Sequence, residues 1–256
     1  MPQEVDLSII APAYNEEDNI APLIARIRAV FEPWAAEHRA TFEAVIVDDG
    51  STDGTRDTLL QLAAQHPWLR VIRLTPNSGQ TAAMDAGFRA ARGRFYGTVD
   101  ADMQNDPGEI PRLLEIMHEK NVDMVNGWRQ KRSDHFLRLI QSRIANGIRN
   151  RLSGDDIQDT GCSLKVYKRE VLEGLTLYRG LHRFFPTLAR MRGFKVIEVP
   201  VSHNQRLHGV TKYKFGSRVI RAFVDLLAIR WMKKRMLRYT AAELRPAEAQ
   251  AASAAH

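Results

Sequence analysis

The chain has 256 residues, 44% of them hydrophobic and 26% charged, a composition that excludes wholesale disorder and allows one large α/β domain. The single cysteine, Cys162, excludes an intramolecular disulfide and a cysteine-based zinc site, and favours a reducing, cytosolic compartment. The N-terminus has no signal-peptide pattern, and no apolar run reaches the roughly 18 residues that span a bilayer. We therefore expect a soluble or peripheral protein.

The net charge of +7 is unevenly distributed along the chain. Residues 1–127 hold 11 basic and 20 acidic residues, whereas the rest of the chain holds 26 basic and 10 acidic ones. Residues 203–238 alone carry ten basic residues against one acid, Asp225. This asymmetry predicts a bound cation in the first half and an anionic molecule or surface as the partner of the second.

Hydrophobic patterning predicts strands that alternate with helices through the first half of the chain. The expected strands there cover residues 6–11, 42–47, 69–74, 94–99 and 122–127, and the expected helices cover 19–31, 55–64, 80–91 and 106–120. The second half is less regular, with a basic helix over 134–152, a strand over 163–167, two helices, a strand over 195–201 and a last helix over 217–238. Such alternation predicts βαβ units, and hence an α/β fold with a mainly parallel sheet flanked by helices.

We expect one domain over residues 1–238 and a flexible alanine-rich tail over 239–256. The last helix places four apolar residues on one stripe and ends in basic residues; the stripe consists of Ile220, Phe223, Leu227 and Trp231. Two interpretations fit this helix. It either docks on the domain with its basic face solvated, or lies at a membrane interface on anionic lipid.

Polar clusters follow three of the expected strands. The first strand is followed by "APAYNEED" and the second by "DDGSTDGT", which contribute Pro12, Tyr14, Glu16, Asp48 and Asp49. The fourth strand is followed by "DADMQ". Each cluster alone is typical of a capped turn. Because a parallel sheet brings the carboxyl ends of its strands together, the three clusters predict one polar crevice.

Asp100 and Asp102 lie two residues apart, so in extended backbone their side chains point the same way. Two carboxylates, with the amide oxygen of Gln104 a further two residues on, suit Mg²⁺ or Mn²⁺, which complete their coordination with water and phosphate oxygens. The sequence has no "GxGxxG" after the first strand and no "GxxxxGK". A Rossmann dehydrogenase or P-loop nucleotidase is therefore not expected, and metal-mediated diphosphate binding is favoured.

The segments "PAYNEEDNI", "VDDGSTDGT", "NSGQTAAMDAGFRAARG" and "VDADMQNDP" resemble the family-2 glycosyltransferases of GT-A fold. More narrowly, they resemble the polyprenyl-phosphate sugar synthases, of which dolichol-phosphate mannose synthase is the best-known type. The similarity continues through "QDTGCSLKVYKREVL" and "VPVSHNQRLHGVTKYKFG" and covers about residues 6–230.

The resemblance implies a metal-dependent transferase that uses Mg²⁺ or Mn²⁺. It would move a hexose, mannose as the first expectation, from a GDP- or UDP-sugar to a polyprenyl phosphate. The acceptor phosphate is already an anionic nucleophile, so we expect a single displacement that inverts the anomeric carbon. A lipid acceptor further implies peripheral attachment to the cytosolic face of the membrane, through the last helix or through a membrane-protein partner.

The same resemblance implies roles for individual residues. The nucleoside pocket would be lined by Pro12, Tyr14, Glu16, Asp48 and Asp49. The metal and the donor diphosphate would be bound by Asp100, Asp102 and Gln104. Phosphates of the donor or acceptor would be held by Arg206, Thr211 and Lys212, with Arg129 and Arg143 as weaker candidates. Asp159 would act near the acceptor as a base or an orienting group, with Asp155 and Asp156 as close rivals.

Three other functions remain as alternatives at this point. A family-2 enzyme could use a saccharide or lipid-headgroup acceptor, and paired aspartates also occur in nucleotidyltransferases. A nucleic-acid-binding protein is disfavoured, because few aromatic residues interleave with the charges of residues 203–238 and no RNA-binding signature is present.

Overall fold

The computed structural model describes residues 4–129, 156–204, 215–237 and 239, and in the last helix it describes side chains from residue 223 onward. Several sequence-based expectations lie outside the described residues. These are the helix over 134–152, the flexibility of residues 240–256, and the phosphate-binding candidates Arg143, Arg206, Thr211 and Lys212, together with Asp155.

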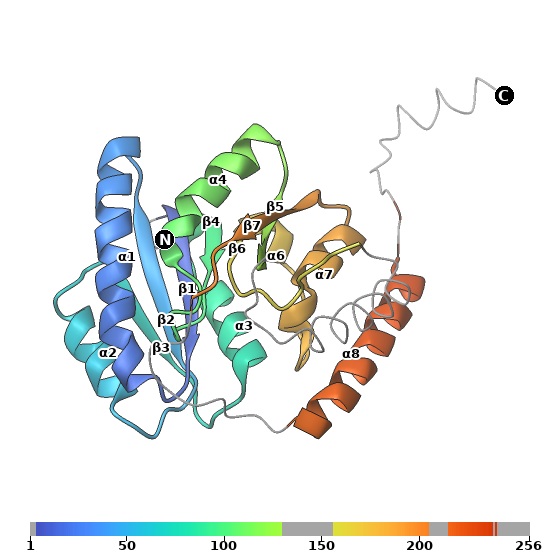
Figure 1. The fold of residues 1–256 in the computed structure, drawn as a ribbon, viewed down its shortest axis with the longest axis horizontal. Coiled ribbons are helices and arrows are strands. Elements are labelled where there is room, and N and C mark those ends of the chain that lie inside the picture. The colour runs from blue at the N-terminus through green and yellow to red at the C-terminus, as the bar shows by residue number, and fades with distance from the viewer. Residues whose placement is uncertain (1–3, 130–155, 205–214, 238, 240–256) are drawn as a thin grey trace, which may run out of the picture.

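Seven strands form one sheet in the order β3-β2-β1-β4-β6-β5-β7 (Figure 1). Their bounds are β1 Val5–Ala13, β2 Phe42–Asp48, β3 Leu69–Arg73, β4 Gly93–Thr98, β5 Met124–Arg129, β6 Lys165–Lys168 and β7 Val196–Val201. Strand β6 runs antiparallel to its neighbours β4 and β5, whereas all other adjacent pairs are parallel. The expected α/β fold with a mainly parallel sheet is confirmed.

The helices lie close to the positions that the sequence predicts. Their bounds are α1 Glu17–His38, α2 Thr55–Ala63, α3 Gln80–Ala90, α4 Ile110–Glu119, α6 Arg169–Leu172, α7 Phe185–Met191 and α8 Phe215–Arg235, with 3₁₀ turns at Pro107–Glu109 (η1) and Leu181–Phe184 (η2). The largest difference is α1, which continues through Pro33 to His38 instead of ending near Phe31. Phe31 is fully buried and its ring contacts those of Trp34 and Phe42, so tertiary packing outweighs the hydrogen bond lost at the proline.

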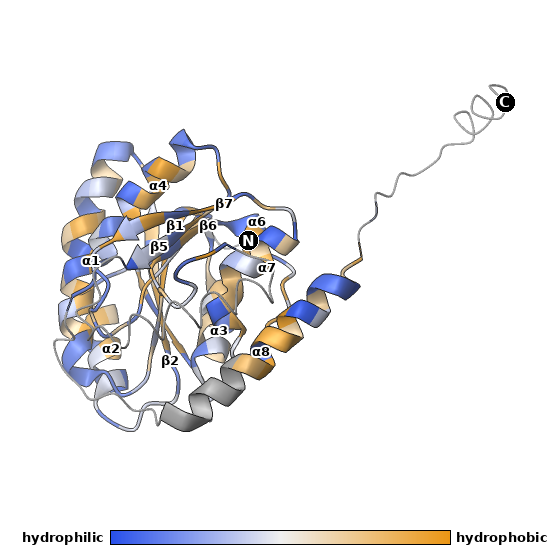
Figure 2. Ribbon diagram, turned by 45° about the vertical axis from the view of Figure 1, so that its right-hand side comes forward, coloured by the Kyte–Doolittle hydropathy of each residue, from blue (hydrophilic) through white to orange (hydrophobic). Residues whose placement is uncertain are grey.

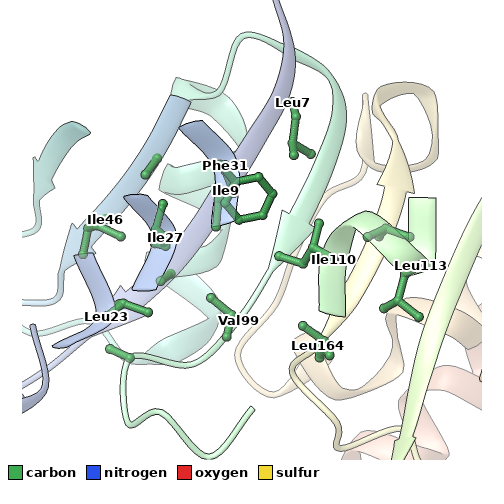
Figure 3. Packing of buried hydrophobic residues seen from close by; sticks show 14 of the residues in the cluster. Leu7, Ile9, Leu23, Ile27, Phe31, Ile46, Val99, Ile110, Leu113 and Leu164 are labelled. Atoms are coloured by element: carbon green, nitrogen blue, oxygen red, sulfur yellow. The ribbon is translucent and has the colours of Figure 1, made fainter. Parts of the chain in front are cut away.

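Two apolar layers sandwich the sheet, because alternate residues of each strand face opposite sides. Leu7 and Ile9 of β1 pack under α1, α2 and α4 (Figure 3), whereas Ile10 faces the layer formed with α3, α6, α7 and α8. Leu164, just before β6, belongs to the first layer and Tyr167 within β6 to the second. With both faces covered by helices, the loops at the carboxyl ends of the parallel strands remain as the place for a ligand.

The chain order of the strands reverses between β1 and β4. From β1 the chain moves outward through β2 and β3, then returns to place β4 on the other side of β1. In open α/β sheets ligands bind outside the carboxyl ends of the strands at such a switch point. The loops after β1, β2 and β4 meet there, as the sequence analysis expects.

Candidate active site

The loops after β1 and β2 are bonded to one another. The backbone N–H of Asn15 donates to Ser51 Oγ at 3.0 Å, and Asn15 Oδ1 accepts from the Thr52 N–H at 2.8 Å. The backbone N–H of Glu16 donates to Thr55 Oγ1 at 2.8 Å, which ties the same loop to the start of α2. These bonds hold the loops after β1 and β2, which carry the first two polar clusters of the sequence, together as one unit.

Asp48 is the last residue of β2, just before the second of these loops, and is fully buried. Its Oδ1 accepts from the backbone N–H of Ser51 at 2.8 Å, whereas its buried Oδ2 has no hydrogen-bond partner among the described residues. Pro12 and Ala13 run alongside Val47 and Asp48 in the β1–β2 register, and the Tyr14 side chain next to them is 37% exposed. A buried acceptor of this kind requires a donor, and an N–H group of a nucleobase is one that suits it.

Asp49 has a different environment from its neighbour. Its Oδ1 accepts from the backbone N–H of Ser78 at 2.8 Å, and its Oδ2 accepts from the Gly79 N–H at 2.8 Å and from Asn77 Nδ2 at 3.0 Å. Gly79 has φ of +90°, a conformation that glycine adopts readily. The carboxylate of Asp49 therefore holds the loop that begins α3, in addition to any contact with a nucleoside.

The acidic pair of "DADMQ" follows β4 and lies across the switch point from Asp48. Asp102 is 7% exposed, and its Oδ1 accepts from the backbone N–H of Gln104 at 3.1 Å. Met103 between them adopts φ of +60°, and the Gln104 carbonyl accepts from the Asn204 N–H at 2.8 Å. Asp100 Oδ1 accepts from Gln80 Nε2 at 2.9 Å. The turn is thus fixed from both sides.

The electrostatics of the pair fit a divalent cation. Burial and the nearby charge of Asp102 raise the pKa of Asp100, while hydrogen bonding from Ser163 and the charges of Lys165 and Arg129 act in the opposite direction. Two carboxylates and the Gln104 amide are oxygen donors of the type that Mg²⁺ and Mn²⁺ prefer. In the part of the chain that the structure describes, no group of three or more His, Cys, Asp or Glu side chains could hold a metal. The fit therefore rests on this oxygen-donor set.

Asp159 is paired with Arg129, the last residue of β5. Arg129 Nε and Nη2 donate to the two Asp159 carboxylate oxygens at 2.7 and 2.9 Å, and both side chains are largely buried. Although burial acts against it, this pairing raises the pKa of Arg129. Glu198 of β7 accepts from the backbone N–H groups of Gln158 and Asp159 at 2.7 and 3.0 Å, and so fixes the loop.

Asp156, one rival of Asp159, is exposed on this loop and forms an ion pair with Arg190. The structure therefore places Asp159, but not Asp156, in a buried position next to Arg129. Of the candidates drawn from the sequence, five gather at one edge of the sheet: Asp48, Asp100, Asp102, Asp159 and Arg129.

Four polar residues of the crevice were not predicted from the sequence: Gln80, Asn105, Ser163 and Lys165. Lys165 is 3% exposed at the start of β6, and although burial lowers its pKa, the charges of Asp159 and Asp100 favour its protonated form. Ser163 Oγ accepts from Asn105 Nδ2 at 2.7 Å. The signal for Lys165 was a single charge within the apolar run "SLKVY", because a lysine is rarely buried without charged neighbours.

Cys162 is fully buried, and burial raises the pKa of its thiol. Its sulfur lies against β5, where a Cβ on Gly127 would come within 2.9 Å of it. A buried, protonated thiol is a poor nucleophile, so its place is in the packing of the sheet.

Comparison with known families matches residues 8–176 to the model described as glycosyl transferase family 2. A dodecaprenyl-phosphate galacturonate synthase of Rhizobium johnstonii is 38% identical over 231 residues, which cover 89% of this chain and 67% of the relative. An undecaprenyl-phosphate 4-deoxy-4-formamido-L-arabinose transferase of Edwardsiella ictaluri is 38% identical over 209 residues, covering 81% and 62%. The chain thus spans about two thirds of the length of these curated relatives.

Solved structures with the same fold include a mannosyltransferase from Pyrobaculum calidifontis in complex with GDP-Man and Mn²⁺. Its TM-score is 0.63 at 20% identity, over 94% of this chain and 67% of that one. A glucosyl-3-phosphoglycerate synthase from Mycobacterium tuberculosis in complex with Mn²⁺, UDP and its product has a TM-score of 0.63 at 16% identity, over 94% and 83%. At these identities the likeness establishes the fold alone, and the expected GT-A fold is confirmed.

Proposed function

The chain belongs to glycosyl transferase family 2, and we propose that it transfers a sugar from a nucleoside diphosphate donor to a polyprenyl phosphate. The observation that carries the proposal is the cluster of charged side chains at the β1–β4 switch point. It combines a buried unpaired acceptor on Asp48, an acidic pair for a divalent cation, and the buried cations Arg129 and Lys165. The names of the relatives, which are polyprenyl-phosphate sugar transferases, support the acceptor class.

Asp100, Asp102 and Gln104 would hold Mg²⁺ or Mn²⁺, and the solved neighbours that contain Mn²⁺ support a divalent ion. Bound there, the ion would supply positive charge against the diphosphate, whose β-phosphate gains negative charge as it leaves. Gln80 orients Asp100 through its amide N–H, and the backbone N–H of Gln104 orients Asp102. The chain thereby presents two fixed carboxylates to the ion, as a preorganised site requires.

The proposed chemistry is a single displacement at the anomeric carbon. An oxygen of the acceptor phosphate forms the new bond to that carbon as the bond to the nucleoside diphosphate breaks, and the diphosphate leaves with the electron pair. The configuration of the carbon therefore inverts. Since the nucleophile is already an anion, no proton has to be removed from it, and positioning supplies more of the rate than base catalysis.

This chemistry favours an orienting role for Asp159 over a role as base. Both of its carboxylate oxygens are engaged by Arg129, which keeps the guanidinium in a buried position at the crevice. Arg129 and Lys165 are then the described cations that an acceptor phosphate would meet. Arginine binds phosphate through a planar pair of N–H donors, which suits this task.

The names of the relatives point to sugars other than mannose. Mannose remains a prediction, whereas the relatives are named for galacturonate and for 4-deoxy-4-formamido-L-arabinose. Glycosyl donors carrying those two sugars are therefore tested first, followed by GDP-mannose. Because the acceptor is a lipid, we place the reaction at the cytosolic face of a membrane, with the protein attached peripherally or through a membrane-protein partner.

The test is transfer of labelled sugar from each donor to undecaprenyl phosphate, followed by extraction into organic solvent. We expect label in the lipid fraction with one donor, dependent on Mg²⁺ or Mn²⁺ and abolished by a chelator. Label in a water-soluble saccharide instead would replace the acceptor with the saccharide alternative. Release of inorganic diphosphate from a nucleoside triphosphate and a sugar phosphate would identify a nucleotidyltransferase.

A further inference from the structure

Helix α8 is held on the domain by one of its faces. Leu226 and Ile229 are 6% and 0% exposed, and Met232 and Met236 pack against the same apolar layer. The Asp225 carboxylate lies so close to Gly180 that a Cβ there would come within 2.4 Å of it. Of the two interpretations of the sequence, docking on the domain therefore holds for this face.

The opposite face of α8 is apolar and exposed. Phe223, Val224, Leu227 and Trp231 are 51%, 57%, 45% and 64% exposed. Figure 2 shows α8 on the outside of the domain, with hydrophobic stretches in its described part. Spacing of four residues places Phe223, Leu227 and Trp231 on one stripe of the helix. The sequence indicated this stripe together with Ile220, whose side chain lies outside the described residues. A helix face in contact with water is normally polar, so a stripe of this kind marks an interaction surface.

The exposed face also carries positive charge. Arg230, Lys234 and Arg235 are exposed, and at 3.6 residues per turn Arg230 and Lys234 fall on the same side as Leu227 and Trp231. The one acid of the segment 215–235, Asp225, points instead to the docked side at Gly180. The face thus combines apolar side chains with cations and has no acid among them.

We propose that this face of α8, formed by Phe223, Val224, Leu227, Arg230, Trp231, Lys234 and Arg235, docks on an anionic lipid surface. The apolar side chains would enter the boundary between headgroups and acyl chains, and the cations would lie at lipid phosphates. Tryptophan is suited to this boundary because its ring is apolar and its N–H is polar. Within the described ranges, none of the helices has the length and apolarity that a membrane span requires.

The docked face connects this surface to the crevice. Gly180, which lies against Asp225, donates its backbone N–H to Thr81 Oγ1 at 2.9 Å. Thr81 follows Gln80 at the start of α3, and Gln80 donates to Asp100. A bilayer held by α8 would therefore lie close to the end of the sheet where the acceptor phosphate is needed. The inference deepens the proposed function and rests on it only for the identity of the acceptor.

The test is flotation of the full chain with vesicles of phosphatidylcholine and phosphatidylglycerol that contain no polyprenyl phosphate. We expect wild type to bind anionic vesicles, more weakly as salt is raised, and the double variant Leu227→Glu/Trp231→Glu to lose binding by at least about ten-fold. The matched control is Leu60→Glu, because Leu60 of α2 is 54% exposed outside this face, and it should bind like wild type. Both positions are exposed, so circular dichroism and thermal unfolding should match wild type.

The outcomes separate this inference from the proposed function. Transfer to a short, water-soluble polyprenyl phosphate should persist in the double variant, because the crevice is unchanged. Equal vesicle binding by the double variant and wild type would overturn the docking surface, as would a dimer of wild type that the double variant abolishes without any vesicle binding. Vesicle binding as expected, but no transfer to any polyprenyl phosphate, would overturn the function and leave the docking surface in place.

Discussion

Asp102 is the residue on which the metal site depends most strongly. It is nearly buried, and asparagine in its place would keep the oxygen that accepts from the Gln104 backbone while removing the charge. We expect Asp102→Asn to lower transfer by at least about 100-fold, because a hard cation loses an anionic ligand. Radiolabel transfer and Mn²⁺ binding by electron paramagnetic resonance measure the effect, and thermal unfolding should be unchanged.

The matched control for this variant is Asp57→Asn, since the Asp57 side chain is 68% exposed on α2 outside the crevice. It should transfer sugar and bind Mn²⁺ like wild type. Near-normal turnover by Asp102→Asn would show that the metal, if one is used, is held elsewhere.

A substitution of Gln80 tests how strongly the orientation of the Asp100 carboxylate affects metal binding. Its amide donates to Asp100 Oδ1 at 2.9 Å from an exposed position, so Gln80→Ala removes the hydrogen bond without opening a cavity. A hydrogen bond to a charged group is worth about 1.5–3 kcal/mol, of which an exposed bond retains the smaller part. We expect the Mn²⁺ dissociation constant to rise about three- to ten-fold with little change in stability.

Gln61→Ala, an exposed glutamine of α2, is the control for that measurement and should leave Mn²⁺ binding unchanged. If Gln80→Ala bound Mn²⁺ with wild-type affinity and reached half-maximal activity at the same Mn²⁺ concentration, the contact with Asp100 would have no positioning role.

At the scale of elements, the loop before α3 depends on Asp49. Three N–H donors from residues 77–79 converge on its carboxylate, and asparagine would turn an N–H₂ group toward some of them. We expect Asp49→Asn to lower the free energy of unfolding by about 1–3 kcal/mol, because partly buried donors lose a charged acceptor. Urea unfolding measures this change.

Asp85→Asn provides the comparison, since Asp85 forms an exposed i, i+4 pair with Arg89 and should cost only about 0.3–0.5 kcal/mol. A weaker donor affinity in Asp49→Asn with unchanged stability would instead identify Asp49 as a nucleoside ligand, which is the role that the family resemblance implies.

The elements that position the acidic clusters were predictable, because the alternation of short apolar runs with amphipathic segments is a local signal. The ends of β1, β2 and β4 lie within two residues of their expected positions, so Asp48 and Asp100 were placed at the correct edge of the sheet. The antiparallel direction of β6 was not predictable, since strand direction depends on pairing with distant partners. Lys165 and Ser163 enter the crevice only because β6 inserts between β4 and β5.

Pairings between residues far apart in the chain could not be predicted from the sequence. Asp159 and Arg129 were both candidates, but their ion pair joins residues 30 positions apart, and no local pattern indicates it. The exposed stripe of α8 shows a similar limit. An apolar stripe at helical spacing predicted an amphipathic helix, but only the fold shows that Leu226 and Ile229 dock while Leu227 and Trp231 do not.

For the whole molecule, carboxylates paired in the fold predict how stability varies with pH. Although burial opposes it, hydrogen bonds from Lys168 Nζ and from the Lys195 backbone lower the pKa of Asp123. A folded pKa below the unfolded one, about 3.9, stabilises the fold at higher pH, and this contribution is lost as pH falls through the folded value. We expect the free energy of unfolding to fall below about pH 4, with a smaller fall in Lys168→Met.

Urea unfolding between pH 7 and pH 3 measures that dependence. An unfolding free energy that stays constant down to pH 3 in wild type would contradict it. Identical pH profiles for wild type and Lys168→Met would remove Asp123 from the explanation.

The central claim is that the crevice at the β1–β4 switch point binds a nucleotide sugar through a divalent cation. The most direct measurement is a crystal structure of the protein with Mn²⁺ and a nucleoside diphosphate. We predict that the base binds at Asp48 Oδ2 and the ion on Asp102. A nucleotide bound instead at the arginine-lined pocket of Arg70, Arg89, Arg92 and Arg169 would contradict the account.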